Sequence, residues 1–78
     1  MDFRAGLVPI DPVLFGQWRS QMEAWQTSQP LRFEVGVRRV ERCLRPGGRT
    51  PGLVAQLQED YTLLQIAWMV AEAARRQL

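Results

Sequence analysis

The chain has 78 residues, a formal net charge of +2 and no histidine; 46% of its residues are hydrophobic and 23% are charged. This composition is close to that of average globular proteins, so it excludes a compositionally disordered chain and predicts one domain over residues 1–78. The single cysteine, Cys43, excludes an internal disulfide, and the lack of histidine argues against a structural zinc site. A domain this small is marginally stable, and self-association or a partner is the remaining common source of stability.

The first predicted helix follows a short arm. Residues 1–10 contain a glycine and a proline and show no sustained hydrophobic period, which predicts an N-terminal arm. The Asp-Pro pair at 11–12 is a helix-start signal, because aspartate can cap the helix and proline suits its first position. We expect a helix over residues 12–27, in which Gly16 suggests that another backbone approaches closely. Its apolar face consists of Leu14, Trp18, Met22 and Trp25.

The segment 31–45 fits two patterns. Apolar and polar residues alternate over 31–37, which is typical of a strand. A helical stripe over the whole segment, formed by Phe33, Val37, Val40 and Leu44, favours a helix instead. We predict a helix over 31–45, because no other segment resembles a partner strand, and we keep the strand at 31–37 as the alternative. The Arg-Pro-Gly-Gly sequence that follows ends this element.

The last predicted helix is the longest and covers residues 51–77. Thr50 is a suitable N-cap and Pro51 a suitable first residue. Two apolar stripes run along it at helical spacing. The first comprises Val54, Leu57, Tyr61, Leu64, Trp68, Ala71 and Leu78 and is broken in polarity only at Arg75. The second comprises Leu63, Ile66, Val70 and Ala73. A helix that is apolar on more than one side is buried on more than one side.

These elements predict an all-α, three-helix domain that cannot cover its own last helix. We therefore expect dimerisation or a partner to complete a helical bundle. The residues expected at that interface are Leu63, Ile66, Trp68, Met69 and Val70. The three tryptophans lie on apolar stripes, so they are interpreted as core residues, with a partner-anchoring role as the alternative.

The sequence offers no catalytic constellation. There is no imidazole base, Cys43 has no histidine to activate it, and no glycine-rich phosphate loop is present. We expect no enzyme activity, catalytic residue, metal, cofactor or small-molecule substrate. The longest apolar run, Ile66–Ala71, is far too short to span a membrane, and the N-terminus does not resemble a secretory signal. A cytoplasmic protein of bacterial or phage origin, without a membrane partner, is therefore expected.

Positive charge is concentrated in the middle of the chain. Residues 32–49 carry six arginines against two glutamates, a net charge of +4. On a helix, Arg38, Arg42 and Arg45 share one face, and Arg49 follows in the loop. These four side chains form either a contact surface for an anion or acidic partner or simply a solvated face. We interpret the protein as a non-enzymatic adaptor, regulator or assembly subunit that acts as a homodimer or as the obligate partner of a larger protein. The alternative is a small nucleic-acid-binding regulator that uses the four arginines.

Overall fold

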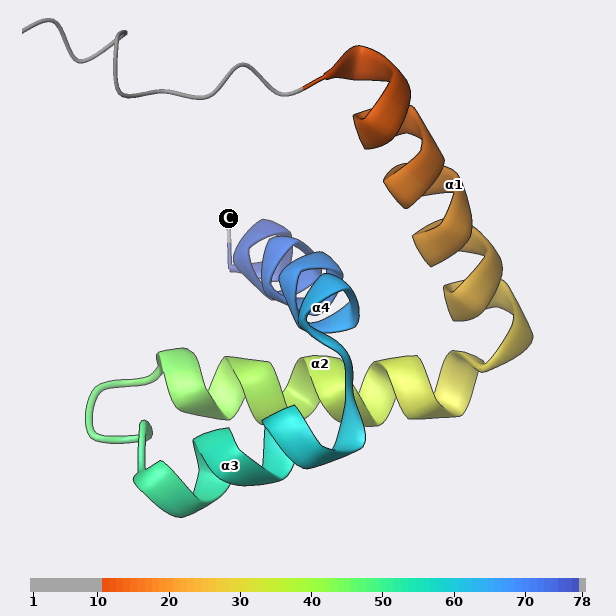
Figure 1. Ribbon diagram of the computed structural model, residues 1–78. Coiled ribbons are helices and arrows are strands. Elements are labelled where there is room, and N and C mark those ends of the chain that lie inside the picture. Colours follow the sequence, from red (N-terminus) through yellow and green to blue (C-terminus); the bar gives the residue numbers. More distant parts are fainter. Residues whose placement is uncertain (1–10, 78) are drawn as a thin grey trace, which may run out of the picture.

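Four helices make up residues 11–77, the part of the chain that the computed structural model describes. They are α1 (Pro12–Ser28), α2 (Pro30–Leu44), α3 (Pro51–Asp60) and α4 (Leu63–Arg76), shown in Figure 1. No strand occurs between residues 11 and 77, so the all-α prediction is confirmed and the alternative strand at 31–37 is wrong. The predicted arm at residues 1–10 lies outside the described residues.

Local sequence signals set the starts of the first three helices, each of which has proline in its first turn. The carboxylate of Asp11 accepts a hydrogen bond from the Val13 amide at 2.9 Å. The hydroxyl of Thr50 accepts one from the Leu53 amide at 3.2 Å. Both side chains satisfy an amide of the first turn that has no partner within the helix. Between α2 and α3, Gly47 adopts φ 75°, the left-handed conformation that favours glycine in a turn.

The C-terminal region contains two helices, so the prediction of one helix over 51–77 and of three helices in total is wrong. The chain is extended at Tyr61 and Thr62. Thr62 and Gln65 form a capping box: the Thr62 hydroxyl accepts from the Gln65 amide at 3.2 Å, and the Gln65 side chain accepts from the Thr62 amide at 3.0 Å. This Thr-x-x-Gln pattern starts a new helix by satisfying two amides at once.

Helix α2 is the centre of the fold, because it supplies Phe33, Val37 and Val40 to the core and its contact with α4 is the most extensive between any two helices. Helix α3 runs alongside it, and α4 lies in the angle between α1 and α2 (Figure 1). The core is small and is built from α2, the end of α3 and the inner side of α4. Its buried members are Phe33, Val37, Val40, Leu57, Tyr61, Met69 and Ala73.

A glycine permits the closest contact in this core. A Cβ atom on Gly36 would lie 2.2 Å from Sδ of Met69 and 2.9 Å from Cζ of Tyr61. Only a residue without a side chain lets α4 and the Tyr61 ring come this close to α2. At Gly16, by contrast, an added Cβ meets nothing within 4 Å, so the expected close backbone approach there is wrong.

Helix α1 is much less well covered than α2. Met22 is its one buried residue, and its first turn exposes Val13, Leu14 and Phe15, with exposed fractions of 66%, 62% and 43%. Its N-terminal half extends away from α2 and α3 (Figure 1). The radius of gyration is 14.4 Å, against roughly 11–12 Å for a compact domain of this length. The fold therefore leaves apolar surface open beside α1 and α4.

Candidate interaction surfaces

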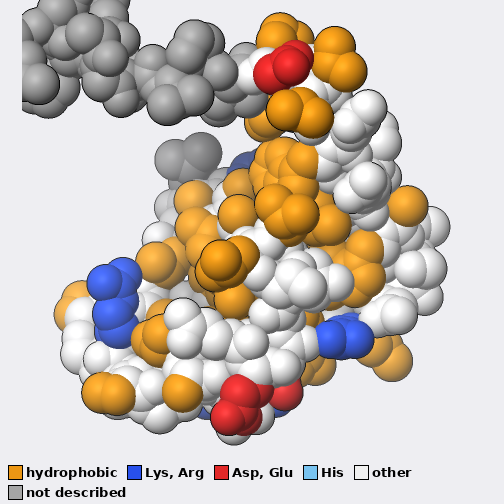
Figure 2. Space-filling model, in the orientation of Figure 1, with side chains coloured by type: hydrophobic (Ala, Val, Ile, Leu, Met, Phe, Trp, Pro, Cys, Tyr) orange, Lys and Arg blue, Asp and Glu red, His pale blue; other side chains and the backbone are white. Residues whose placement is uncertain are grey.

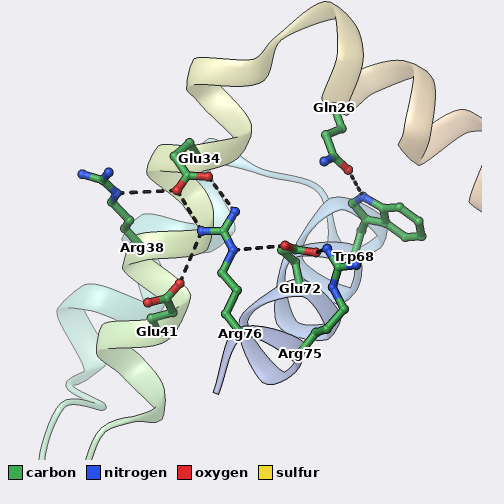
Figure 3. A network of polar contacts seen from close by, with 8 residues as sticks. All are labelled: Gln26, Glu34, Arg38, Glu41, Trp68, Glu72, Arg75 and Arg76. Carbon is green, nitrogen blue, oxygen red and sulfur yellow. Dashed lines mark hydrogen bonds and ion pairs between the residues drawn. The ribbon is translucent and has the colours of Figure 1, made fainter. Parts of the chain in front are cut away.

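A charged network fastens the C-terminal end of α4 to α2 (Figure 3). The Arg76 guanidinium donates to both carboxylate oxygens of Glu34, each at 2.8 Å, and to Glu72 at 3.0 Å. Glu41 lies 3.6 Å from the same guanidinium, and Arg38 lies 3.7 Å from Glu34. The bidentate pair with Glu34 is the strongest geometry in the network. It joins the last turn of α4 to α2 on the side where Met69 and Ala73 are buried in the core.

The network shifts the proton affinities of its members. Hydrogen bonds from Arg76 are the main reason that the pKa of Glu34 lies below its ordinary value. The same contacts, with Glu34 first and Glu72 second, raise the pKa of Arg76. The carboxylates of Glu34 and Glu72 are thus both paired with Arg76. No group of three or more His, Cys, Asp or Glu side chains suited to a metal occurs among the described residues.

A second polar cluster joins α2 to the end of α3. Asp60 accepts hydrogen bonds from Gln56 at 3.1 Å and Arg39 at 2.6 Å, and these two contacts lower its pKa. Arg32 donates to the Asp60 carbonyl, and its guanidinium lies 5.2 Å from the centre of the Tyr61 ring. The Tyr61 hydroxyl in turn donates to the Arg32 carbonyl at 2.8 Å. Two of the six arginines in the basic segment therefore have structural roles.

The outward side of α4 carries a continuous apolar surface, here called the α4 apolar face. It consists of six exposed residues, Leu63, Leu64, Ala67, Val70, Ala71 and Ala74. At about 100° per residue these positions occupy an arc of about 120°, and no polar residue of α4 falls within it. Leu63 is 77% exposed and Leu64 55%. In Figure 2, hydrophobic side chains run from the first turn of α1 across to the start of α4.

The predicted interface residues occupy three different environments. Leu63 and Val70 lie on the α4 apolar face. Ile66 and Trp68 are half-buried against the core, and Met69 is fully buried within it. A charge at Ile66 would consequently disturb the fold itself. The predicted list of interface residues lacks four members of the face, namely Leu64, Ala67, Ala71 and Ala74.

An open groove of about 570 Å³ lies between α1 and α4, beside this face. Two tryptophans form part of its wall: the Trp18 and Trp68 rings meet edge to face, with centroids 5.3 Å apart. Trp18 Nε1 donates to the Leu64 carbonyl at 3.3 Å, and Trp68 Nε1 donates to Gln26 at 3.0 Å. Trp25 packs edge to face on the Phe33 ring of the core. Through these contacts the three tryptophans hold α1 against α2 and α4.

The four predicted arginine positions are all exposed. Arg38 pairs loosely with Glu34, as described above. Arg42, Arg45 and Arg49 take part in no ion pair within residues 11–77. They lie at the end of α2 and in the loop before α3. Their charge is therefore available to an external anion or acidic surface.

Comparison with protein-family models, with curated proteins and with solved structures finds no match to this chain. None of the helices between Pro12 and Arg76 is long and apolar enough to cross a membrane. Cys43, the lone cysteine, is half-buried and packs against the core.

Proposed function

We propose that this chain is a non-enzymatic protein–protein interaction protein that acts in the cytoplasm as an adaptor, regulator or assembly subunit. It works as a homodimer or as the obligate partner of a larger protein, and that association completes a helical bundle around α4. The observation that supports this function is the α4 apolar face, an exposed and wholly apolar side of a helix. Soluble monomers rarely leave a contiguous apolar surface of this kind in water.

Covering this face buries apolar side chains and thereby favours association. Leu63, Leu64 and Val70 are 77%, 55% and 39% exposed. Burying one large aliphatic side chain completely contributes roughly 1.5–3 kcal/mol, so these partly exposed residues, equivalent to fewer than two full side chains, together contribute about 2.5–5 kcal/mol before association costs. The neighbouring first turn of α1 adds three more exposed apolar residues, Val13, Leu14 and Phe15.

Site-specific photo-cross-linking in the cells that make the protein tests this function. A photoreactive phenylalanine analogue replaces Val70, at the middle of the α4 apolar face. The control carries the same analogue at Gln58, an exposed residue on α3. We expect a discrete cross-linked product from position 70 and none from position 58. Equal labelling from both positions, or no discrete product from position 70, would show that the face is not an interaction surface.

A second candidate function is nucleic-acid binding through Arg38, Arg42, Arg45 and Arg49. The specific observation in its favour is that the last three form no ion pair within the described residues, whereas other arginines of the chain are used internally. Exposed guanidinium groups that are close in sequence and free of carboxylate partners suit contact with phosphates.

A gel-shift titration over a salt series tests the second function. Binding should weaken steeply with salt, because each neutralised phosphate releases counterions and contributes about 0.9 to the log–log slope. The triple variant Arg42→Gln/Arg45→Gln/Arg49→Gln should lower that slope by about 2–3, whereas the control Arg19→Gln should leave it unchanged. No shift at low salt removes this candidate.

A further inference from the structure

The α4 apolar face is graded in size along the helix. Its N-terminal end carries two leucines, Leu63 and Leu64, and its C-terminal end carries two alanines, Ala71 and Ala74. Along its central line, large and small side chains alternate: Leu63, Ala67, Val70 and Ala74 follow one another at spacings of four, three and four residues. That spacing is the one by which two packed helices meet along a common seam. A helix that covers the face must match this order of large and small side chains.

We propose that the occupant of the α4 apolar face is the α4 helix of a second copy of this chain, running antiparallel about a two-fold axis. Leu63 of each copy then lies opposite Ala74 of the other, and Ala67 lies opposite Val70. This inference rests on the proposed interaction function and names the partner and its orientation. The larger-protein partner that the function also allows becomes an outcome of the test.

Side-chain volume favours the antiparallel arrangement. In it, every layer along the seam pairs one large side chain with one alanine: Leu63 with Ala74 at the two ends and Val70 with Ala67 in the middle. Uniform layers let the two helix axes run at a constant separation and pack without voids. A parallel pair would instead stack leucine on leucine and alanine on alanine. The wide and narrow layers would then alternate, leaving gaps at the alanines.

Charge favours the same orientation. The C-terminal end of α4 carries Arg75 and Arg76. The Arg75 side chain is 74% exposed, so a parallel pair would place two such guanidinium groups at the same end of the interface. The antiparallel pair separates them by the length of the face and so avoids this repulsion.

The size of the surface sets the expected strength of the dimer. Six residues of α4 and the exposed first turn of α1 are fewer than the roughly 20–30 residues that each partner contributes to a standard interface. The dimer is therefore expected to dissociate on dilution, and its population to depend on concentration.

Directed disulfide cross-linking tests the orientation. In a Cys43→Ser background, one protein carries Leu63→Cys and a second carries Ala74→Cys; both positions are exposed in the fold. The ends of the face are about 16 Å apart along the helix, beyond the reach of a disulfide. Under mild oxidation of an equimolar mixture, we expect a mixed dimer that links the two proteins, and no disulfide dimer from either protein alone. Disulfide dimers within each separate protein would overturn the antiparallel arrangement.

A size substitution gives an independent readout by light scattering. Ala74→Leu places leucine opposite Leu63 of the second copy, so the dissociation constant should rise by about tenfold or more. The exchange variant Leu63→Ala/Ala74→Leu restores the large–small pairing and should return it close to the wild-type value. A parallel pair predicts the opposite sign for Ala74→Leu alone, because leucine would fill the alanine layer and tighten the dimer.

Failure of this inference and failure of the proposed function give different results. A folded wild-type protein that stays monomeric up to roughly 1 mM overturns the second copy as occupant. If position 70 then still photo-cross-links to one heavier protein, the interaction function stands without self-association. If position 70 forms no discrete product, both fail.

Discussion

Replacing Gly36 by alanine tests whether α4 packs on α2 as closely as the structure shows. Alanine is the better helix former by about 1 kcal/mol, so in an open helix this substitution would stabilise the fold. At Gly36, however, the new methyl carbon would lie 2.2 Å from Met69 Sδ and 2.9 Å from the Tyr61 ring. Local helix propensity therefore predicts that Gly36→Ala raises the free energy of unfolding, whereas tertiary packing predicts that it lowers it.

The buried surroundings of Gly36 decide which effect is larger. Met69 is flexible but fully buried, so its sulfur cannot move away without displacing other atoms of the core or reaching the surface. The Tyr61 ring is held by its hydroxyl, which donates to the Arg32 carbonyl at 2.8 Å. Overpacking of a closed core costs about 1–3 kcal/mol, and the severity of this contact places the cost toward the upper end. After the gain in propensity, we expect a net loss of about 1–2 kcal/mol, or about 4–16 °C in Tm for a domain of this size.

Circular dichroism during urea unfolding measures this loss, with all proteins at one concentration because association also stabilises the fold. Gly16→Ala is the matched control: it lies within α1, and an added Cβ meets nothing within 4 Å. We expect the control to gain about 0.5–1 kcal/mol from propensity. If Gly36→Ala raised the free energy of unfolding as the control does, the close approach of α4 to α2 would be refuted.

Three further results are expected. Thr62→Ala should lose about 1 kcal/mol of stability in urea unfolding because it breaks the capping box with Gln65, whereas Thr62→Ser should lose little; equal losses would contradict the cap. The lowered pKa of Glu34 means that its contact with Arg76 contributes stability above the ordinary value near 4.5 and loses it as the pH falls through the folded pKa. Glu34→Gln should therefore flatten the stability profile between about pH 5 and 3, by at most about 1 kcal/mol because the pair is partly exposed, and an unchanged profile would rule out this pair as its origin. Val70→Asp should shift light scattering toward the monomer, whereas Leu31→Asp, at an 81% exposed site on α2, should not; a shift from both would point to general loss of solubility.

Much of the secondary structure was predictable because its causes are local. Asp11 and Thr50 cap their helices through hydrogen bonds that span only two or three residues. The stripe of Phe33, Val37, Val40 and Leu44 predicted the buried side of α2. The first three residues are in the core, whereas Leu44, at the end of the helix, is 39% exposed. The arginines at 42, 45 and 49 were expected on an exposed surface, where they lie. Caps and periodicity depend on neighbours in the chain, so one sequence is enough to show them.

The break between α3 and α4 had a local signal too, but a competing one outweighed it. The Thr62–Gln65 capping box is visible in the sequence, yet the apolar seam continues at helical spacing across it, and the seam alone predicts one long helix. Whether the capping box or the apolar seam prevails depends on the tertiary contacts that a turn at this point makes possible. Folding back at Tyr61 lets Met69 and Ala73 join the core on α2, whereas a straight helix could not return to it.

Only the tertiary structure decided which side of the last helix became a surface. Ile66, Met69 and Ala73 turn toward the core on α2, and the ion pair of Arg76 with Glu34 forms on the same side. The opposite side is left with Leu63 and Val70 exposed, so two of the five residues expected at the interface lie on the α4 apolar face. An apolar residue has the same periodic signal whether it meets its own chain or another, because burial depends on where distant helices come to lie. Sequence alone therefore showed that α4 has more apolar surface than one neighbour can cover, and the fold determined which part of it remains open.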